Sequence, residues 1–282
     1  MKSGKEIIIV TGASSGIGKS VVDILARDDD NELIMACRNL AKGEKARQEI
    51  IRSNCDASVR LMHLDIASFR SIRSFVEEIA KRGIKPTKLL NNAGTMCRSF
   101  STTEEGLETT MATNYVGTYL LTKLMMPLMA DHFNIVNTVS ISRLMSHIDE
   151  TILVADKQTY SQLGSYGKSK LALLVASTYL SKNMPHGGVL SVTDPGIVNS
   201  QMITLYRWFD PLTDILFRPF CKSTQKAAIP AINALYSQKS GQLFHGNRSQ
   251  IIPKRYARHP LLPSLIRITE EVISEKLQRT PA

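Results

Sequence analysis

Tyr166 and Lys170, four positions apart, carry side chains that proton transfer requires. If this segment is helical, the two residues lie on one face, so the phenol and the ammonium meet near the same ligand. A free tyrosine ionises at a pH of about 10 and is a poor base at neutral pH, but a nearby ammonium favours the phenolate and lowers its pKa. We therefore expect Tyr166 to give a proton to a carbonyl oxygen, or to remove one from an alcohol, beside Lys170.

A second candidate site is the glycine-rich turn after the apolar run Ile7-Ile8-Ile9-Val10. Glycines let the backbone turn tightly and approach a pyrophosphate, and the N-terminus of a following helix offers free N–H groups to it. The spacing is G-x-x-x-G-x-G, which differs from the common G-x-G-x-x-G dinucleotide motif. We expect a dinucleotide to bind this turn rather than the turn being merely tight. Its residues are Thr11, Gly12, Ala13, Ser14, Ser15, Gly16, Ile17 and Gly18.

The end of the second predicted strand, Ala36-Cys37-Arg38, indicates which dinucleotide binds. A carboxylate at this turn would accept hydrogen bonds from a ribose 2′-hydroxyl and favour NAD. Here the turn has no carboxylate, and the Arg38 guanidinium suits a 2′-phosphate. NADP(H) is therefore the predicted cofactor.

The elements that must position these residues alternate between short β-branched runs and helical patterns. This alternation predicts an α/β fold, a doubly wound parallel sheet of the Rossmann type, in one domain spanning residues 1–282. Strands are predicted at 6–10, 32–37, 58–64, 87–91, 133–139, 188–193 and 242–245. Helices are predicted near 16–27, 41–53, 68–82, 104–131, 165–183 and 223–237. A C-terminal helical extension is predicted over about 253–282.

Six motifs occur in an order that resembles the short-chain dehydrogenase/reductase family across nearly the whole chain. They are Thr11-Gly12 with Gly16-Ile17-Gly18, Asn91-Asn92-Ala93-Gly94, Asn114, a serine that ends the fifth strand, Tyr166 with Lys170, and Pro195-Gly196. Each motif is common alone, and a Tyr–Lys pair by itself would suit an exposed helix. The stretch before Tyr166 and the tail further resemble retinol-dehydrogenase-like and carbonyl-reductase-like members.

The resemblance implies the remaining catalytic residues. Asn114 would anchor a water that connects Lys170 to solvent, and Lys170 would also hold the nicotinamide ribose. Ser140 matches the place of the catalytic serine, whose hydroxyl polarises the reacting oxygen. Because the chain reads Ser140-Ile141-Ser142, Ser142 remains the alternative.

The resemblance also implies further cofactor contacts. Asp65 would meet the adenine, although it equally suits the cap of the next helix. Asn92, Ala93 and Gly94 would line the cofactor groove. Pro195 and Gly196 would face the nicotinamide, and Ser200 stands where relatives often have a threonine for the carboxamide.

Composition limits the classes of protein and partner. The net charge of +10 at pH 7 is spread along the chain without a nucleic-acid-binding motif, so we expect a solvated basic surface and no nucleic acid partner. Cys37, Cys55, Cys97 and Cys221 form no C-x-x-C pair, which predicts reduced thiols and no metal site. No run is apolar enough to span a membrane, and the expected location is cytoplasmic.

The expected function is hydride transfer between NADP(H) and a carbonyl or alcohol substrate. The apolar and aromatic residues of 197–222 suggest a loop over an apolar substrate such as a retinoid, a steroid, a lipid aldehyde or a ketone. The alternative for this segment is an ordinary pair of helices that packs on the core. The alternative is a catalytically silent NADP(H)-binding regulator on the same fold. The family often pairs the helices near 104–131 and 165–183 in dimers, so a homodimer is a candidate assembly, which the long stretch 141–164 would obstruct.

Overall fold

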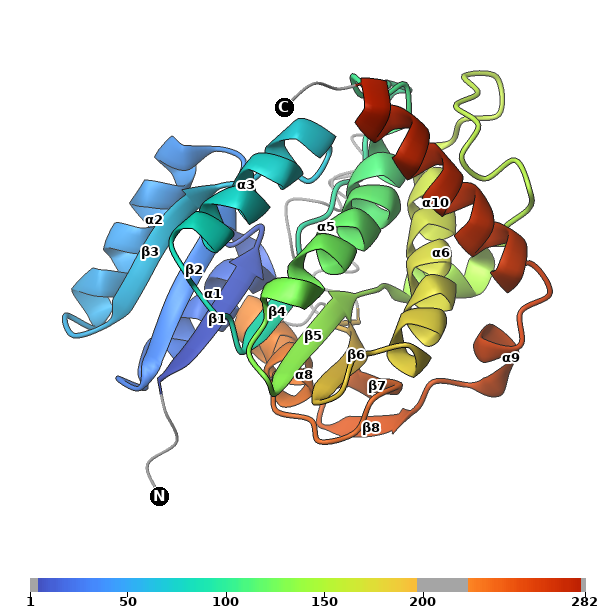
Figure 1. Ribbon diagram of the computed structural model, residues 1–282. Coiled ribbons are helices and arrows are strands. Elements are labelled where there is room, and N and C mark those ends of the chain that lie inside the picture. Colours follow the sequence, from blue (N-terminus) through green and yellow to red (C-terminus); the bar gives the residue numbers. More distant parts are fainter. Residues whose placement is uncertain (1–4, 197–222, 280–282) are drawn as a thin grey trace, which may run out of the picture.

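The computed structural model describes residues 5–196 and 223–279. Within these residues, eight strands form one twisted sheet (Figure 1). They are β1 (Glu6–Thr11), β2 (Asn31–Cys37), β3 (Ser58–His63), β4 (Lys88–Asn91), β5 (Phe133–Thr138), β6 (Gly188–Asp194), β7 (Gln242–His245) and β8 (Arg248–Ile251). The seven strand predictions are confirmed within two residues at each end.

The order of the strands explains where a ligand would bind. It is β3-β2-β1-β4-β5-β6-β7-β8, so the chain crosses over after β3 and continues on the other side of β1. All neighbouring pairs are parallel except β7 and β8. In such sheets the crevice beyond the carboxyl ends of the strands, where the order reverses, holds the ligand. Here that crevice lies between β1 and β4.

The antiparallel strand β8 was not predicted. Its sequence, Arg248-Ser249-Gln250-Ile251, is largely polar and all four residues are exposed. A polar edge strand has little of the apolar alternation that marks a half-buried strand, and only its pairing with β7 defines it.

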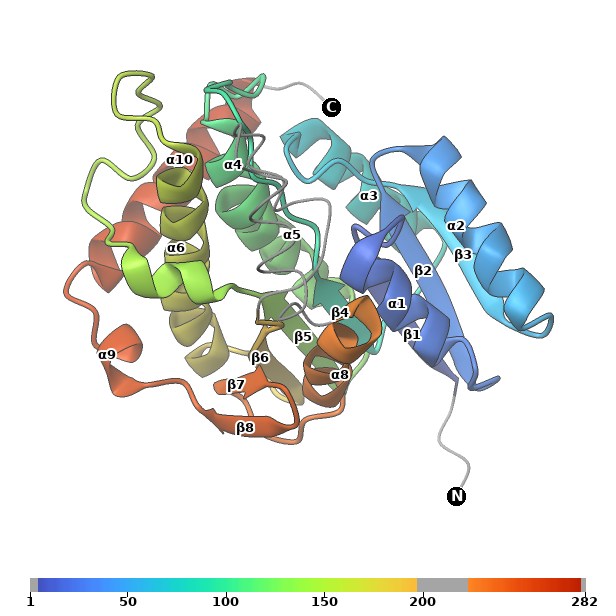
Figure 2. The same cartoon turned by 180° about the vertical axis from the view of Figure 1, so that it is seen from behind.

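Helices cover both faces of the sheet, as a doubly wound fold requires. Three lie on the face seen in Figure 2: α1 (Gly16–Leu25), α2 (Leu40–Ser53) and α8 (Thr224–Leu235). The opposite face carries α3 (Phe69–Lys81), α5 (Gly117–Met125) and α6 (Gln162–Lys182). Successive strand residues alternate between the two cores, so Ile8 packs with the first group and Ile9 with the second.

The predicted helix over 104–131 is wrong in its start and its continuity. Helix begins only at α4 (Thr109–Met111), because both carboxylate oxygens of Glu108 accept backbone N–H groups of the first turn, at 2.7 and 2.9 Å. A π-helical turn follows over Ala112–Val116, before α5 and a 3-10 turn at Met126–Leu128. Single π-helical turns are frequent at functional sites, and this one contains Asn114.

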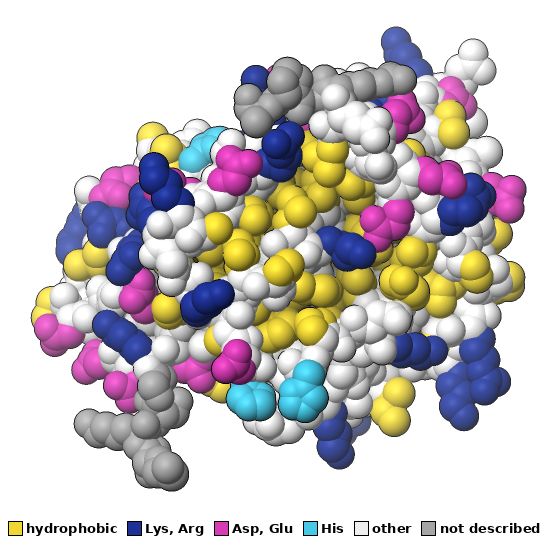
Figure 3. Space-filling model, viewed as in Figure 1, with side chains coloured by type: hydrophobic (Ala, Val, Ile, Leu, Met, Phe, Trp, Pro, Cys, Tyr) yellow, Lys and Arg dark blue, Asp and Glu magenta, His cyan; other side chains and the backbone are white. Residues whose placement is uncertain are grey.

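The C-terminal segment lies against the helices of the second face. After a short helix α9 (Lys254–Ala257), α10 (Leu262–Arg279) runs in front of α5 and α6 (Figure 1). Tyr119 donates a hydrogen bond of 2.6 Å to Glu270, which also pairs with Lys123 at 3.0 Å. Tyr115 and Thr269 share a buried hydrogen bond of 2.7 Å. Apolar side chains still gather across the part of this face that α10 leaves open (Figure 3).

Two predicted features lie outside the described residues. These are the substrate loop at 197–222, with Ser200, and Cys221. Among helices of the described part of the chain, none has the length and apolar character needed to cross a membrane.

Candidate active site

The glycines of the turn between β1 and α1 leave room for another backbone segment or a ligand to approach closely. Gly12 has a φ of +66°, and a Cβ there would lie 2.8 Å from Cα of Ala93. A Cβ on Gly18 would lie 2.7 Å from the carbonyl oxygen of Gly12. Ser15, which precedes α1, makes no side-chain capping bond to the helix. The first N–H groups of α1 therefore remain available to an anion, which fits a pyrophosphate at the carboxyl end of β1.

Thr11 joins this turn to the turn after β4. Its hydroxyl accepts hydrogen bonds from the backbone N–H groups of Asn92, at 3.0 Å, and Ala93, at 2.9 Å. The Asn92 side-chain amide in turn donates to the Thr11 carbonyl at 3.1 Å. The residues predicted to line the cofactor groove are thus held directly against the glycine turn.

Two buried asparagine side chains connect the sheet to helices α5 and α6 by hydrogen bonds. Asn91 donates to the side chain of Asn137 on β5 at 2.8 Å and to Thr122 on α5 at 2.9 Å. Asn137 then donates to Ser177 on α6 at 2.9 Å. Because a buried polar group left unpaired is costly, these bonds fix how α5 and α6 sit on the sheet.

Asn114 and Lys170 meet at Gly94. A Cβ on Gly94 would lie 3.1 Å from Oδ1 of Asn114 and 3.4 Å from Nζ of Lys170. The Asn114 side chain accepts from the N–H of Thr95 and donates to its carbonyl, each at 2.8 Å, and it donates to Ser169 at 3.0 Å. Three motifs far apart in the sequence are therefore brought to one point.

Tyr166, which is half-buried, and Lys170, which is buried, lie on α6 next to the end of β5. Lys170 Nζ donates to the Thr138 carbonyl at 2.8 Å and lies 5.9 Å from the centre of the Tyr166 ring. The Ser140 hydroxyl is close enough to lower the pKa of the Tyr166 phenol, and it accepts the N–H of Ser142 at 3.3 Å. Ser142 instead has a buried hydroxyl with no hydrogen-bond partner among the described residues.

The turn after β5 packs tightly on α6. A Cβ on Gly167 would lie 2.1 Å from the Ser146 hydroxyl and 3.0 Å from the Ser142 carbonyl. Glycine at the position after Tyr166 therefore allows the 3-10 turn Ile141–Met145 to approach the helix. This contact fixes Ser140 next to the tyrosine.

The expected lowering of the pKa of Tyr166 by Lys170 is wrong for this structure. Burial raises the pKa of the Tyr166 phenol, the hydrogen bond with Ser140 lowers it, and the negative charge of Asp194 raises it. Burial also lowers the pKa of Lys170 to about 8, against a raising effect of Asp194. The lysine directs its hydrogen bond to a backbone carbonyl instead, and the phenol stays protonated at neutral pH.

Sequence analysis missed a buried ion pair beside these residues. Arg143 Nη1 donates to the carboxylate of Asp194 and, at 2.6 Å, to the Ser140 carbonyl. The other oxygen of Asp194 accepts the Gly196 N–H at 3.0 Å. Both charges were visible in the sequence, since Arg143 follows the fifth predicted strand and Asp194 the sixth, but their pairing was not.

The remaining predicted cofactor residues follow the carboxyl ends of β2, β3 and β6. Arg38 is exposed immediately after β2. Asp65 lies two residues beyond β3, where it accepts the N–H of Ala67 at 3.0 Å, and the cap of α3 is Ser68 rather than Asp65. Pro195 is buried, and Gly196 has a φ of +77°.

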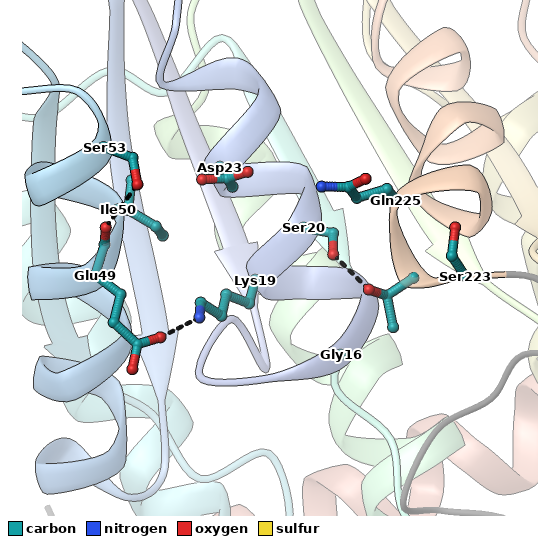
Figure 4. A pocket seen from close by; sticks show the side chains of 10 residues that line it. Gly16, Lys19, Ser20, Asp23, Glu49, Ile50, Ser53, Ser223 and Gln225 are labelled. Carbon is teal, nitrogen blue, oxygen red and sulfur yellow. Dashed lines mark hydrogen bonds and ion pairs between the residues drawn. The ribbon is translucent and has the colours of Figure 1, made fainter.

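A shallow pocket lies on the other side of α1 and is distinct from this crevice. Its volume is about 340 Å³, and of the predicted site residues only Gly16 lines it. Lys19 pairs with Glu49 of α2 across it, and Ser20 donates to Thr224 of α8 at 2.8 Å (Figure 4). Within residues 5–196 and 223–279, no group of three or more His, Cys, Asp or Glu side chains is arranged to hold a metal ion.

Comparisons with known proteins agree with this geometry. The family model described as short chain dehydrogenase matches residues 6–207. WW domain-containing oxidoreductase of Gallus gallus is 31% identical, with 98% of this chain and 70% of that protein covered. Retinol dehydrogenase 12 of Mus musculus is 34% identical, with 83% and 74% covered.

Solved structures share the fold at low sequence identity. A protein from Mycobacterium paratuberculosis aligns with a TM-score of 0.76 at 23% identity, covering 95% of this chain and 93% of that one. A short chain dehydrogenase from Shigella flexneri 2A complexed with NADP aligns with a TM-score of 0.67 at 21% identity, covering 87% and 98%.

Proposed function

Because this chain is an oxidoreductase that belongs to the short-chain dehydrogenase/reductase family, we propose that it transfers a hydride between NADP(H) and a carbonyl or alcohol. The observation that carries the proposal is the meeting of Ser140, Tyr166 and Lys170 beyond the carboxyl end of β5. The glycine turn lies across the same crevice, at the reversal point of the sheet.

NADP(H), when bound, would supply or accept the hydride, and the protein would handle the proton. Tyr166, kept protonated by burial, gives its proton to the oxygen of a carbonyl substrate. Ser140, which lies near the tyrosine, polarises that oxygen by hydrogen bonding to it. Lys170 and Asn114, which lie on either side of Gly94, form the path by which the proton is replaced.

The substrate class that we propose is apolar. The turn that follows Ser140 exposes Ile141, Leu144 and Met145, which leave 43%, 54% and 87% of their surfaces accessible. Exposed apolar side chains beside a candidate site commonly contact a ligand. One relative reported above is named a retinol dehydrogenase, and retinol is an apolar alcohol.

The test is oxidation of NADPH or NADH by the purified full chain with a broad panel of apolar aldehydes and ketones. Turnover with at least one carbonyl supports the proposal. NADPH binding without turnover over the whole panel would instead favour the silent regulator.

Arg38 supports NADP(H) over NAD(H), because its guanidinium is exposed at the end of β2, where a 2′-phosphate would lie. Arg38→Asp is expected to weaken NADPH binding by about 10- to 100-fold, since it removes a charge-assisted hydrogen bond. NADH binding should be unchanged or stronger, because a carboxylate suits a free 2′-hydroxyl. Fluorescence titration with both cofactors measures this. The control is Arg52→Asp, the same charge change on an exposed residue of α2; equal losses in the two variants would contradict the assignment.

Ser140 is our choice for the catalytic serine because its hydroxyl lies near the Tyr166 phenol and lowers its pKa. Ser140→Ala should lower kcat by about 10²–10³-fold, as the loss of one donor to a developing oxyanion does. Ser142→Ala should change kcat by less than about threefold, because its hydroxyl has no partner among the described residues. Steady-state kinetics of the two variants measures both losses of kcat. A larger loss in Ser142→Ala than in Ser140→Ala would assign the catalytic role to Ser142.

A further inference from the structure

The buried pair of Arg143 and Asp194 lies next to the site but is not part of the reaction described above. Only 7% of the arginine side chain and 4% of the aspartate side chain are exposed. A buried ion pair is weak evidence for stability, because desolvation of the two charges offsets most of their attraction. Its presence beside the site therefore calls for another explanation.

The pair connects two turns that carry site residues. Arg143 holds the Ser140 carbonyl, at 2.6 Å, while bound to Asp194. Asp194 holds the N–H of Gly196, at 3.0 Å. One end of the pair thus fixes the turn of the catalytic serine, and the other fixes the turn assigned to the nicotinamide.

The pair also sets the charge around Tyr166 and Lys170. The charged groups near this tyrosine are Lys170 on its own helix and Asp194 at the end of β6, which pairs with Arg143 on the turn after β5. Lys168, also on α6, is half-exposed and lies 3.9 Å from Asp149. Asp194 favours the protonated form of both Tyr166 and Lys170.

We propose that Arg143 and Asp194 are positioning residues that lock the Ser140 turn to the Pro195-Gly196 turn and balance the charge at Tyr166 and Lys170. This inference rests on the proposed function. Neither residue contacts the reacting atoms; each acts through the groups that do.

The first test is the pH profile of kcat for carbonyl reduction by the full chain. Activity requires the protonated acid, so it is present at low pH and is lost as pH rises through the pKa of the Tyr166–Lys170 pair. Asp194→Asn removes a negative charge and should move this loss to lower pH. Arg143→Met removes a positive charge and should move it to higher pH, each by about half a unit or more.

The double variant Arg143→Met/Asp194→Asn protects the test against a misfolded single variant. It removes both charges, so it should lose activity at a higher pH than Asp194→Asn alone. Its maximal kcat should remain below that of the wild-type chain. Glu6→Gln is the matched control, because Glu6 pairs with the buried Lys88 at the other end of the strands, at 2.6 Å. This control should leave the profile unchanged. Shifts in the same direction for both single variants, or no shift, would overturn the charge-balancing role.

The second test needs no turnover. Asp194→Asn keeps an oxygen that accepts the Gly196 N–H, whereas Asp194→Ala loses it. We expect NADPH to bind about tenfold more weakly to Asp194→Ala and within about threefold of wild type to Asp194→Asn. Equal affinities in both variants would overturn the positioning role. If the wild-type chain reduces no carbonyl, the proposed function fails, while this binding comparison still decides the role of the pair.

Discussion

Tyr166→Phe is expected to abolish carbonyl reduction, with a fall in kcat of about 10²–10⁴-fold or more, while NADPH binding stays intact. The substitution removes only the phenolic hydroxyl, which is the proposed proton donor and lies near Ser140. The ring keeps its place on α6, so the crevice retains its shape. Stopped-flow or steady-state oxidation of NADPH measures turnover, and fluorescence titration measures cofactor affinity.

The matched control for this prediction is Tyr160→Phe. Tyr160 lies just before α6, and its hydroxyl donates to the backbone carbonyl of Cys97. Loss of one such bond should reduce kcat by less than about tenfold. Undiminished activity in Tyr166→Phe, or an equal loss in the two variants, would contradict the assigned chemistry.

Gly18→Ala is expected to reduce NADPH affinity by about 10²-fold or more while the chain still folds. A Cβ at this position would lie 2.6 Å from Nδ2 of Asn92 and 2.7 Å from the Gly12 carbonyl. The asparagine side chain can move, but the carbonyl belongs to the backbone of the glycine turn, so the turn itself must shift. Isothermal titration with NADPH and thermal unfolding by circular dichroism separate binding from stability.

Gly83→Ala provides the comparison for that variant. Gly83 has a φ of +63°, and a Cβ there would meet nothing within 4 Å. Its replacement should therefore cost about 1–2 kcal/mol of stability through backbone strain alone and leave NADPH affinity unchanged. If Gly18→Ala bound NADPH as tightly as Gly83→Ala, the glycine turn would not be the cofactor site.

The sequence predicted the fold well because its signals are local. The apolar β-branched run Ile7-Ile8-Ile9-Val10 marks a buried strand without knowledge of the strand order. Glycine at position 12 marks the turn after it, because a Cβ there would collide with the backbone of Ala93. The prediction of one helix over 104–131 was wrong because its signals are not local. Its start depends on the side chain of Glu108, and its π-helical turn depends on packing, which periodicity does not contain.

The site was predictable as a set of motifs but not as a set of interactions. The four-residue spacing placed Tyr166 and Lys170 on one helix, yet it could not reveal that Lys170 donates to the Thr138 carbonyl. The effect of burial on the pKa of Tyr166 likewise depends on the groups around it. Arg143 and Asp194 come from separate turns, and only the folded chain shows that they pair.

The C-terminal helix has a consequence for how this protein could assemble. Family members often pair through the helices that correspond to α5 and α6, and here α10 lies over both of them. A second copy could pack on the part of that face beneath α10 only by displacing this helix, which would break the Tyr115–Thr269 and Tyr119–Glu270 hydrogen bonds and expose the apolar residues beneath. Helix α10 therefore covers, within one chain, part of the face through which family members often pair.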